Sequence, residues 1–190
     1  MVENEILTNK INIYEKPKKK IDQLKFSWKD FIPSMIYGPL ILAQIFLIFF
    51  YYNHCNLDFL TWIGWGFIIF FLLFGSLPRQ AFKKYGEIEK RKSHINTTKL
   101  VDKGIYSIIR HPYWFSWIIL SISLTLMSQH WIMFLLGIPA WIVIYLETFM
   151  LDKGLIMKFG DDYIKYREKV PRINLILGLI KYCTRKKRED

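Results

Sequence analysis

Two long apolar stretches, 31–78 and 111–152, interrupt an otherwise polar chain. Phe, Ile, Leu and Trp dominate both, and each stretch is long enough for two helices of the roughly 20 residues that cross a bilayer. Short polar breaks at 54–58 and 128–130 divide the stretches. The pattern predicts an all-α integral membrane protein with about four transmembrane helices in two hairpins, over about 31–53, 59–78, 112–128 and 131–151.

The third predicted span is short, and the C-terminal region after the fourth span is polar. Tyr113–Met127 is short for a span, but a short helix can cross where the bilayer thins or where the hairpin packs on its neighbours. Residues 153–190 are polar and hold one apolar run, Ile173–Ile180, which is far too short to cross. We expect 153–190 to form a cytosolic helical lid, with this run on the bilayer surface or against the bundle. Residues 1–30 form a polar, basic N-terminal segment.

The distribution of charge gives this topology an orientation. All 27 Lys and Arg residues lie in the blocks 1–30, 79–110 and 153–188. By the positive-inside rule these blocks are cytoplasmic, so the N- and C-termini are cytoplasmic and the two short links are external. A net charge of +11 on a soluble protein would suggest nucleic acid, but 52% hydrophobic and 17% aromatic residues favour a membrane instead. We therefore expect no nucleic-acid partner.

The cysteines and the N-terminal segment give no indication of a disulfide, a metal site or a signal peptide. Cys55 and Cys183 fall on opposite sides of the membrane in this topology and cannot pair. No CxxC or Cys/His spacing typical of a metal site occurs, so we expect no metal. Residues 1–30 contain no apolar core, so they do not resemble a cleavable signal peptide.

The segment 96–112, NTTKLVDKGIYSIIRHP, carries the first candidate chemistry. Proline is favoured at the first position of a helix, so the third span is expected to start at Pro112, directly after Arg110 and His111. A helix N-terminus exposes unpaired N–H groups and a partial positive charge. Together these features predict an anion site at the membrane face. The alternative is that Arg110 and His111 are only a positive flank of the span.

Glu147 is a second candidate, near the cytosolic end of the fourth span. A charged side chain costs about 2.5–3.5 kcal/mol at the centre of a span on insertion scales, and less near an interface. Glu147 is therefore a functional candidate, with the alternative that it meets water at headgroup depth. Further on, Gly160 can end a helix, and Tyr163 and Tyr166 share one face of the next. That helix is either functional or a surface helix with interfacial aromatics.

Taken together, LVDKGIYSIIRHP, a helical hairpin and LDKGLIMKFGDDYIKYREKVPRI resemble the isoprenylcysteine carboxyl methyltransferase and phospholipid methyltransferase superfamily. That family's pattern runs roughly L-V-x-x-G-x-Y-x-x-x-R-H-P-x-Y, a span pair, then E-E-x-x-L-x-x-x-F-G-x-x-Y-x-x-Y-x-x-x-V-P-R. The resemblance extends from Lys99 to Ile173, and 1–98 is similar only as a hydrophobic hairpin. It implies a single membrane methyltransferase-like domain over 31–190.

The resemblance implies that S-adenosylmethionine binds in a cytosol-facing pocket roofed by the C-terminal segment. Carried over residue by residue, it assigns the methionine carboxylate to Arg110 and His111. Backbone and ring contacts to the cofactor are implied for four residues of the preceding loop, namely Leu100, Val101, Gly104 and Tyr106.

The remaining implied site residues lie after the fourth span begins. Asp152 falls at the second Glu of the family pair and is expected to bind the ammonium or ribose of the cofactor. Tyr163 and Tyr166 are expected to help close the lid. Glu147 and Asp152 are the candidate catalytic residues. The implied activity is methyl transfer to a lipid-like or small amphipathic acceptor at the cytosolic membrane face.

Three departures from the family pattern affect the choice of acceptor. Leu151 replaces the first Glu, Asp152 is one methylene shorter than the second, and Trp114 stands where the family has Tyr. Glu147 lies one turn before Leu151 on the same face and is a candidate for the missing acid's role. Some carboxyl methyltransferases of the family have an Arg near this position. An acid there would repel a carboxylate, which favours an amine, hydroxyl or thiol acceptor over a prenylcysteine carboxylate.

Two other functions stay open. Membrane sterol and enone reductases, which use NADPH, also carry an RHP-like motif near a C-terminal helical hairpin, although the FG-x-x-Y-x-x-Y-x-x-x-VPR ending fits the methyltransferases better. The departures at Leu151 and Asp152 leave a catalytically inert family member as the second alternative.

Overall fold

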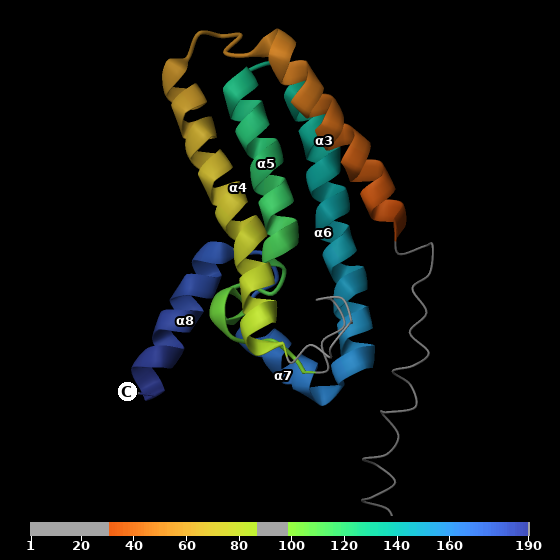
Figure 1. Cartoon of the computed structure of the whole chain (residues 1–190), viewed down its shortest axis with the longest axis vertical. Coiled ribbons are helices and arrows are strands. Elements are labelled where there is room, and N and C mark those ends of the chain that lie inside the picture. The colour runs from red at the N-terminus through yellow and green to blue at the C-terminus, as the bar shows by residue number, and fades with distance from the viewer. Residues whose placement is uncertain (1–30, 87–98, 190) are drawn as a thin grey trace, which may run out of the picture.

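The computed structural model describes residues 31–86 and 99–189, in which helices alternate with short loops and no strand occurs (Figure 1). The predicted all-α architecture is confirmed for this part of the chain, whereas the basic segment 1–30 lies outside the described residues. The elements are α3 Ile32–Tyr51, α4 Asp58–Tyr85, the 3₁₀ helix η2 Gly104–Ser107, α5 Pro112–Ser128, α6 Trp131–Phe159, α7 Asp161–Lys169 and α8 Leu175–Glu189.

Three of these helices, α3, α4 and α6, are long and apolar enough to cross a membrane by length and composition. At 1.5 Å per residue, α3 with its 20 residues extends about 30 Å, the thickness of a bilayer's hydrocarbon core. The 17 residues of α5 reach only about 26 Å. The helices indicate an integral membrane protein, in which α5 is the short apolar helix that the sequence predicts.

Two helices run past their predicted ends. The fourth span was predicted to end at 151, but α6 continues to Phe159, so the start of the predicted lid 153–190 is the last part of α6. Likewise α4 continues beyond 78 to Tyr85. An apolar stretch ends with the bilayer, but Lys, Leu and Met still favour a helix in water. The helix α6 stops only at Gly160, whose φ of 58° lies in the left-handed region that favours glycine.

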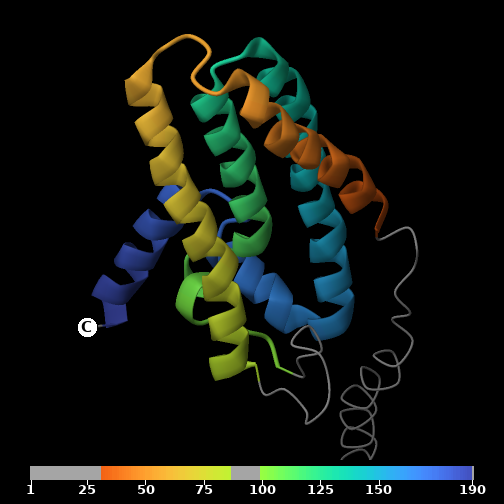
Figure 2. The same cartoon turned by 45° about the horizontal axis from the view of Figure 1, so that its top comes forward.

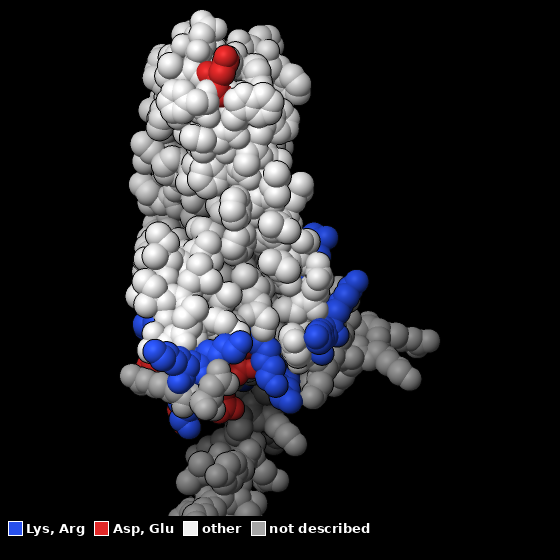
Figure 3. All heavy atoms as spheres, turned by 90° about the vertical axis from the view of Figure 1, so that its left-hand side faces the viewer, with Lys and Arg blue, Asp and Glu red and all other residues white. Residues whose placement is uncertain are grey.

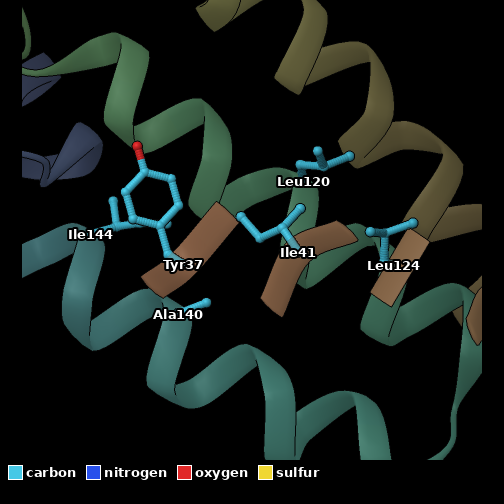
Figure 4. Close-up of a cluster of buried hydrophobic side chains, with 6 residues drawn as sticks. All are labelled: Tyr37, Ile41, Leu120, Leu124, Ala140 and Ile144. Carbon is cyan, nitrogen blue, oxygen red and sulfur yellow. The ribbon is translucent and has the colours of Figure 1, made fainter. Parts of the chain in front are cut away.

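The bundle is built around α5. Helix α4 lies along α5, α3 lies along α6, and α5 contacts α3, α4 and α6 (Figures 1 and 2). The core between α3, α5 and α6 is apolar, and close packing of such side chains is the main source of helix association in a membrane. Figure 4 shows this cluster, which consists of Tyr37, Ile41, Leu120, Leu124, Ala140 and Ile144.

A buried polar tie fixes the register of α3. Gln44 is fully buried, its Nε2 donates to the carbonyl of Met133 at 2.9 Å, and its Oε1 accepts from the Ser121 hydroxyl at 2.7 Å. One side chain thus joins α3, α5 and α6 where no water competes. Tyr37 lies two turns earlier on the same face of α3, so this register also directs Tyr37 towards the bundle interior.

The two hairpin turns meet at one end of the bundle. The N–H groups of Asn53 and His54 donate to the carbonyls of Met127 at 2.8 Å and Ser128 at 3.0 Å. The opposite end holds η2 and α7, and on the face shown in Figure 3 Lys and Arg gather towards that end. The separation of turns from cations agrees with the charge pattern along the sequence.

Helix α8 docks closely on the loop before α5. A Cβ added at Gly178 would lie only 2.1 Å from the backbone oxygen of Ile108, so the two backbones touch. Ile173 and Leu175 pack against a buried cluster that includes Ile109. The apolar run expected on the bilayer surface or against the bundle therefore begins against the bundle.

Candidate active site

The start of α5 is held by the segment that follows α7. Pro112 is the first residue of α5, as predicted. The backbone N–H groups of Arg110 and His111 donate to the carbonyls of Pro171 at 3.0 Å and Arg172 at 3.1 Å. Arg110 and His111 are both buried, with 8% and 3% exposure. They are therefore part of a packed site rather than an exposed positive flank.

Asp152 is the centre of this site and is buried. Arg110 Nη1 donates to Asp152 Oδ1 and Oδ2 at 3.0 and 2.9 Å, and His111 Nε2 lies 2.8 Å from Oδ1. The Tyr163 hydroxyl also donates to Oδ1. Arg172 donates twice to Oδ2, from Nε at 3.1 Å and from Nη2 at 2.8 Å. We call these five residues the Asp152 cluster; it joins α6, α7 and the segments before α5 and after α7.

The protonation states in the cluster follow from burial. Burial lowers the pKa of the His111 imidazole below its ordinary value, although the hydrogen bond to Asp152 and its charge act in the opposite direction. A neutral ring that is paired with a carboxylate through Nε2 donates the Nε2 hydrogen and keeps Nδ1 as an acceptor. Burial, reinforced by Asp152, raises the pKa of Tyr163, so its hydroxyl remains a donor.

Arg172 is a member of the cluster that the sequence analysis did not select. Its guanidinium carbon lies 3.4 Å from the ring centroid of Phe149 and 5.9 Å from that of Tyr145. These rings and Asp152 share one face of α6. The planar guanidinium of Arg172 can therefore stack on the rings and pair with the carboxylate at the same time. The signal in the sequence was the Arg of the VPR motif, which formed part of the resemblance but received no role.

The tyrosines of α7 bring the predicted loop residues beside the cluster. Tyr163 and Tyr166 are buried with Leu100 packed against them. The Tyr166 hydroxyl donates to the backbone carbonyl of Tyr106 at 2.7 Å, and burial raises the pKa of this hydroxyl well above its usual value. Of the predicted residues in this loop, Leu100 and Tyr106 therefore directly contact α7.

The other two predicted loop residues have local structural features. Val101 is buried. Gly104 begins η2 with a φ of 66°, a conformation that strains any residue with a side chain. This explains the glycine through the backbone turn that leads to Arg110, and its contact with a cofactor stays a prediction.

Glu147 lies apart from the Asp152 cluster, because it precedes Asp152 by about 7.5 Å along the axis of α6 at 1.5 Å per residue. Its side chain is only 8% exposed and lies between helices rather than in water. Tyr37 of α3 and Trp114 of α5 are its polar neighbours. The Trp114 ring also meets the His111 ring edge-on, with centroids 5.9 Å apart. Trp114 thus connects the surroundings of Glu147 to the Asp152 cluster.

The cluster fits the carboxylate end of S-adenosylmethionine. Two guanidinium groups face one carboxylate, which leaves a net positive charge at the N-terminus of α5. Arg110 Nε is buried and has no hydrogen-bond partner among the described residues. An anion at this place would satisfy that donor. The oxygens of Asp152 already accept from four side chains, so its binding of a cofactor ammonium or ribose requires one of them to move.

No group of three or more His, Cys, Asp or Glu residues within 31–86 and 99–189 is placed to hold a metal ion.

The model of the Isoprenylcysteine carboxyl methyltransferase (ICMT) family matches residues 67–150. The matched range includes most of α4, the loop with Arg110 and His111, α5 and most of α6, and it ends two residues before Asp152. Neither the curated proteins nor the solved structures compared with the chain give a match. The family match supports membership of the chain in the isoprenylcysteine carboxyl methyltransferase superfamily, and the resemblance predicted from the motifs is confirmed.

Proposed function

We propose that the protein transfers a methyl group from S-adenosylmethionine to a lipid-like or small amphipathic acceptor at the cytosolic face of the membrane. The observation that carries the proposal is the buried, net-positive Asp152 cluster at the start of α5. The family match supports methyltransferase chemistry, and three apolar helices support a membrane setting.

In this proposal Arg110 holds the carboxylate of the methyl donor through its unpaired Nε–H, while His111, which donates its Nε2–H to Asp152, positions the cluster. The donor supplies a methyl group on a positively charged sulfur, from which a nucleophile can displace it. Asp152 positions Arg110 and Arg172 by accepting hydrogen bonds from both. Further cofactor contacts come from Leu100, Val101, Gly104 and Tyr106, which lead into the site.

The chain's own contribution to the reaction is orientation and exclusion of water. Tyr163 and Tyr166 anchor α7 over the site through their hydroxyls. A closed site of this kind can hold the acceptor and the methyl group about 3–3.5 Å apart and aligned. The activation barrier falls because the two groups lose their relative freedom on binding and not in the reaction step. It also keeps competing water away from the reacting atoms.

The proposed topology has four crossings, with α5 as the enclosed third. Both termini are cytoplasmic, and the part of 153–190 beyond α6 forms the cytosolic lid. The hydrogen-bonded hairpin turns at one end and the cations at the other support this orientation.

The two cysteines provide a direct measurement of the topology. Cys55, between α3 and α4, and Cys183, in α8, are both exposed thiols. In sealed cells that express the protein, we expect a membrane-impermeant maleimide to label Cys55 alone, and to label Cys183 only after permeabilisation. The single variants Cys55→Ser and Cys183→Ser assign each label. Labelling of Cys183 in sealed cells would contradict a cytoplasmic C-terminal segment.

Calorimetry on the purified protein tests the function itself. We expect S-adenosylhomocysteine, the product of the donor, to bind with a measurable Kd, and NADPH not to bind. Binding of NADPH alone would instead support a reductase. Binding of neither would identify an inert family member. Either result would overturn the proposal.

A further inference from the structure

One carboxylate oxygen and one indole N–H, each without a hydrogen-bond partner, lie close together inside the bundle. Glu147 is 8% exposed, and its Oε2 is buried without a hydrogen-bond partner in the described part of the chain. Trp114 Nε1 is also buried without a partner there. Tyr37 and Trp114 are the donors that face this carboxylate, and its Oε2 has no partner within hydrogen-bonding distance. Buried polar groups are nearly always paired, so the unpaired carboxylate oxygen indicates that a hydrogen-bond donor is missing at this place. The Trp114 N–H is itself a donor and does not select such a ligand.

The charge of the Glu147 carboxylate determines which charge a ligand at this site should carry. Within 31–86 and 99–189 no Lys, Arg or His forms an ion pair with Glu147, whereas Asp152, on the same helix, is paired with Arg110, His111 and Arg172. A buried carboxylate is costly unless a cation compensates it. A second carboxylate from a ligand would add repulsion instead. The site therefore favours a ligand that carries a positive charge.

The walls of the site are aromatic, which also suits a cation. Tyr113 and Trp114 meet edge-on with centroids 5.2 Å apart. In Figure 4 the Tyr37 side chain extends from α3 towards α5. An ammonium beside aromatic rings gains cation–π attraction, and this attraction grows when water is excluded.

The location relates this ligand to the proposed methyl transfer. Trp114 lies between the two sites, since its ring is beside Glu147 and also touches the ring of His111. One indole ring thus separates a group held at Glu147 from the residues that would hold the methyl donor. An acceptor that enters from the bilayer also needs an apolar tail, because α3 and α6 are apolar around this point.

We propose, resting on the proposed methyltransferase function, that the acceptor is an amphipathic amine whose nitrogen is held by Glu147 between Tyr37 and Trp114. A bound ammonium gives one proton to the Glu147 carboxylate. The freed nitrogen lone pair then forms the new N–C bond to the methyl group while the old C–S bond breaks and leaves its electron pair on sulfur. The N-methylated product leaves as an ammonium ion, and Glu147 returns its proton to solvent.

The experiment compares three probes with the same tail: dodecylamine, dodecanol and dodecanoate. The protein is held in nanodiscs of zwitterionic lipid, and empty nanodiscs correct for partitioning. Binding is measured without a methyl donor, as the shift in unfolding temperature with probe concentration. We expect dodecylamine to stabilise the protein more than dodecanol, and dodecanoate to have no such effect. With S-adenosylmethionine added, mass spectrometry should find N-methyldodecylamine and no methyl dodecanoate.

The variant Glu147→Gln keeps the shape of the side chain and removes its charge. We expect it to weaken dodecylamine binding by about tenfold or more, the usual size of a hydrogen bond to a charged group. Its affinity for S-adenosylhomocysteine should stay within about twofold of the natural protein. Glu168→Gln, at an exposed glutamate of α7, is the matched control and should change neither.

Two results would overturn the amine assignment: preferential binding or methylation of dodecanoate, or undiminished amine binding by Glu147→Gln. If that variant no longer binds S-adenosylhomocysteine, the comparison of the three probes on the natural protein decides alone. A natural protein that fails to bind S-adenosylhomocysteine contradicts the proposed function itself. One that binds it and methylates dodecanoate contradicts only the acceptor.

Discussion

Replacing Asp152 by Asn is expected to abolish binding of S-adenosylhomocysteine and to lower the unfolding temperature. The isosteric amide leaves the buried guanidinium of Arg110 and the partly buried guanidinium of Arg172 without their counter-charge. Breaking a buried pair in this way costs about 3–5 kcal/mol. If the loss appears in binding, it corresponds to at least about a hundredfold weaker Kd. Calorimetry and thermal unfolding of the purified variant measure the two effects.

The controls for this variant separate charge from helix structure. Asp161 and Asp162 are exposed carboxylates at the start of α7, and their replacement by Asn should change stability by only about 0.5 kcal/mol. Asp152→Glu restores the family's residue and keeps the charge, so it should retain binding where Asn does not. An Asp152→Asn variant that binds S-adenosylhomocysteine as tightly as the natural protein would show that the cluster does not organise the donor site.

The parts of the site that the sequence predicted are those set by local rules. Pro112 at the start of α5 follows from the missing N–H of proline, and Gly160 at the end of α6 follows from the backbone freedom of glycine. The motif resemblance placed Arg110, His111 and Asp152 together, and the structure brings these three side chains within hydrogen-bonding distance. Short-range geometry and a family pattern were therefore sufficient to predict that these three side chains lie together.

The parts that were missed depend on contacts between distant segments. Tyr37 lies in a uniformly apolar stretch, and nothing in its neighbourhood distinguishes it from a lipid-facing tyrosine; only the packing of α3 on α6 brings it to Glu147. The role of Arg172 depends on the path of the chain after α7, which returns across the start of α5. The ends of α4 and α6 were missed for a different reason. Hydropathy shows where the chain leaves the hydrocarbon region of the bilayer, and a helix can continue beyond that point.

Arg172 offers the second large effect, and it distinguishes a planar cation from a simple charge. Arg172→Lys keeps the positive charge but loses the paired hydrogen bonds from Nε and Nη2 to Asp152 and the stacking on Phe149. Hydrogen bonds to charged groups contribute about 1.5–3 kcal/mol, so Lys should weaken S-adenosylhomocysteine binding by about tenfold or more. Arg172→Met keeps the packing, removes the charge as well, and should weaken binding further.

We expect the affinity for S-adenosylhomocysteine to fall from the natural protein to Arg172→Lys and again to Arg172→Met. Calorimetry on each purified variant measures this order. Arg167 is exposed on α7, so Arg167→Lys is the matched control and should bind as the natural protein does. If Arg172→Lys binds S-adenosylhomocysteine as tightly as the natural protein does, the cluster provides only net charge. The bidentate geometry at Asp152 is then not required. If Lys and Met are equally weak, the stacked, two-pronged guanidinium is what holds Asp152 in place, and through Asp152 the orientation of Arg110.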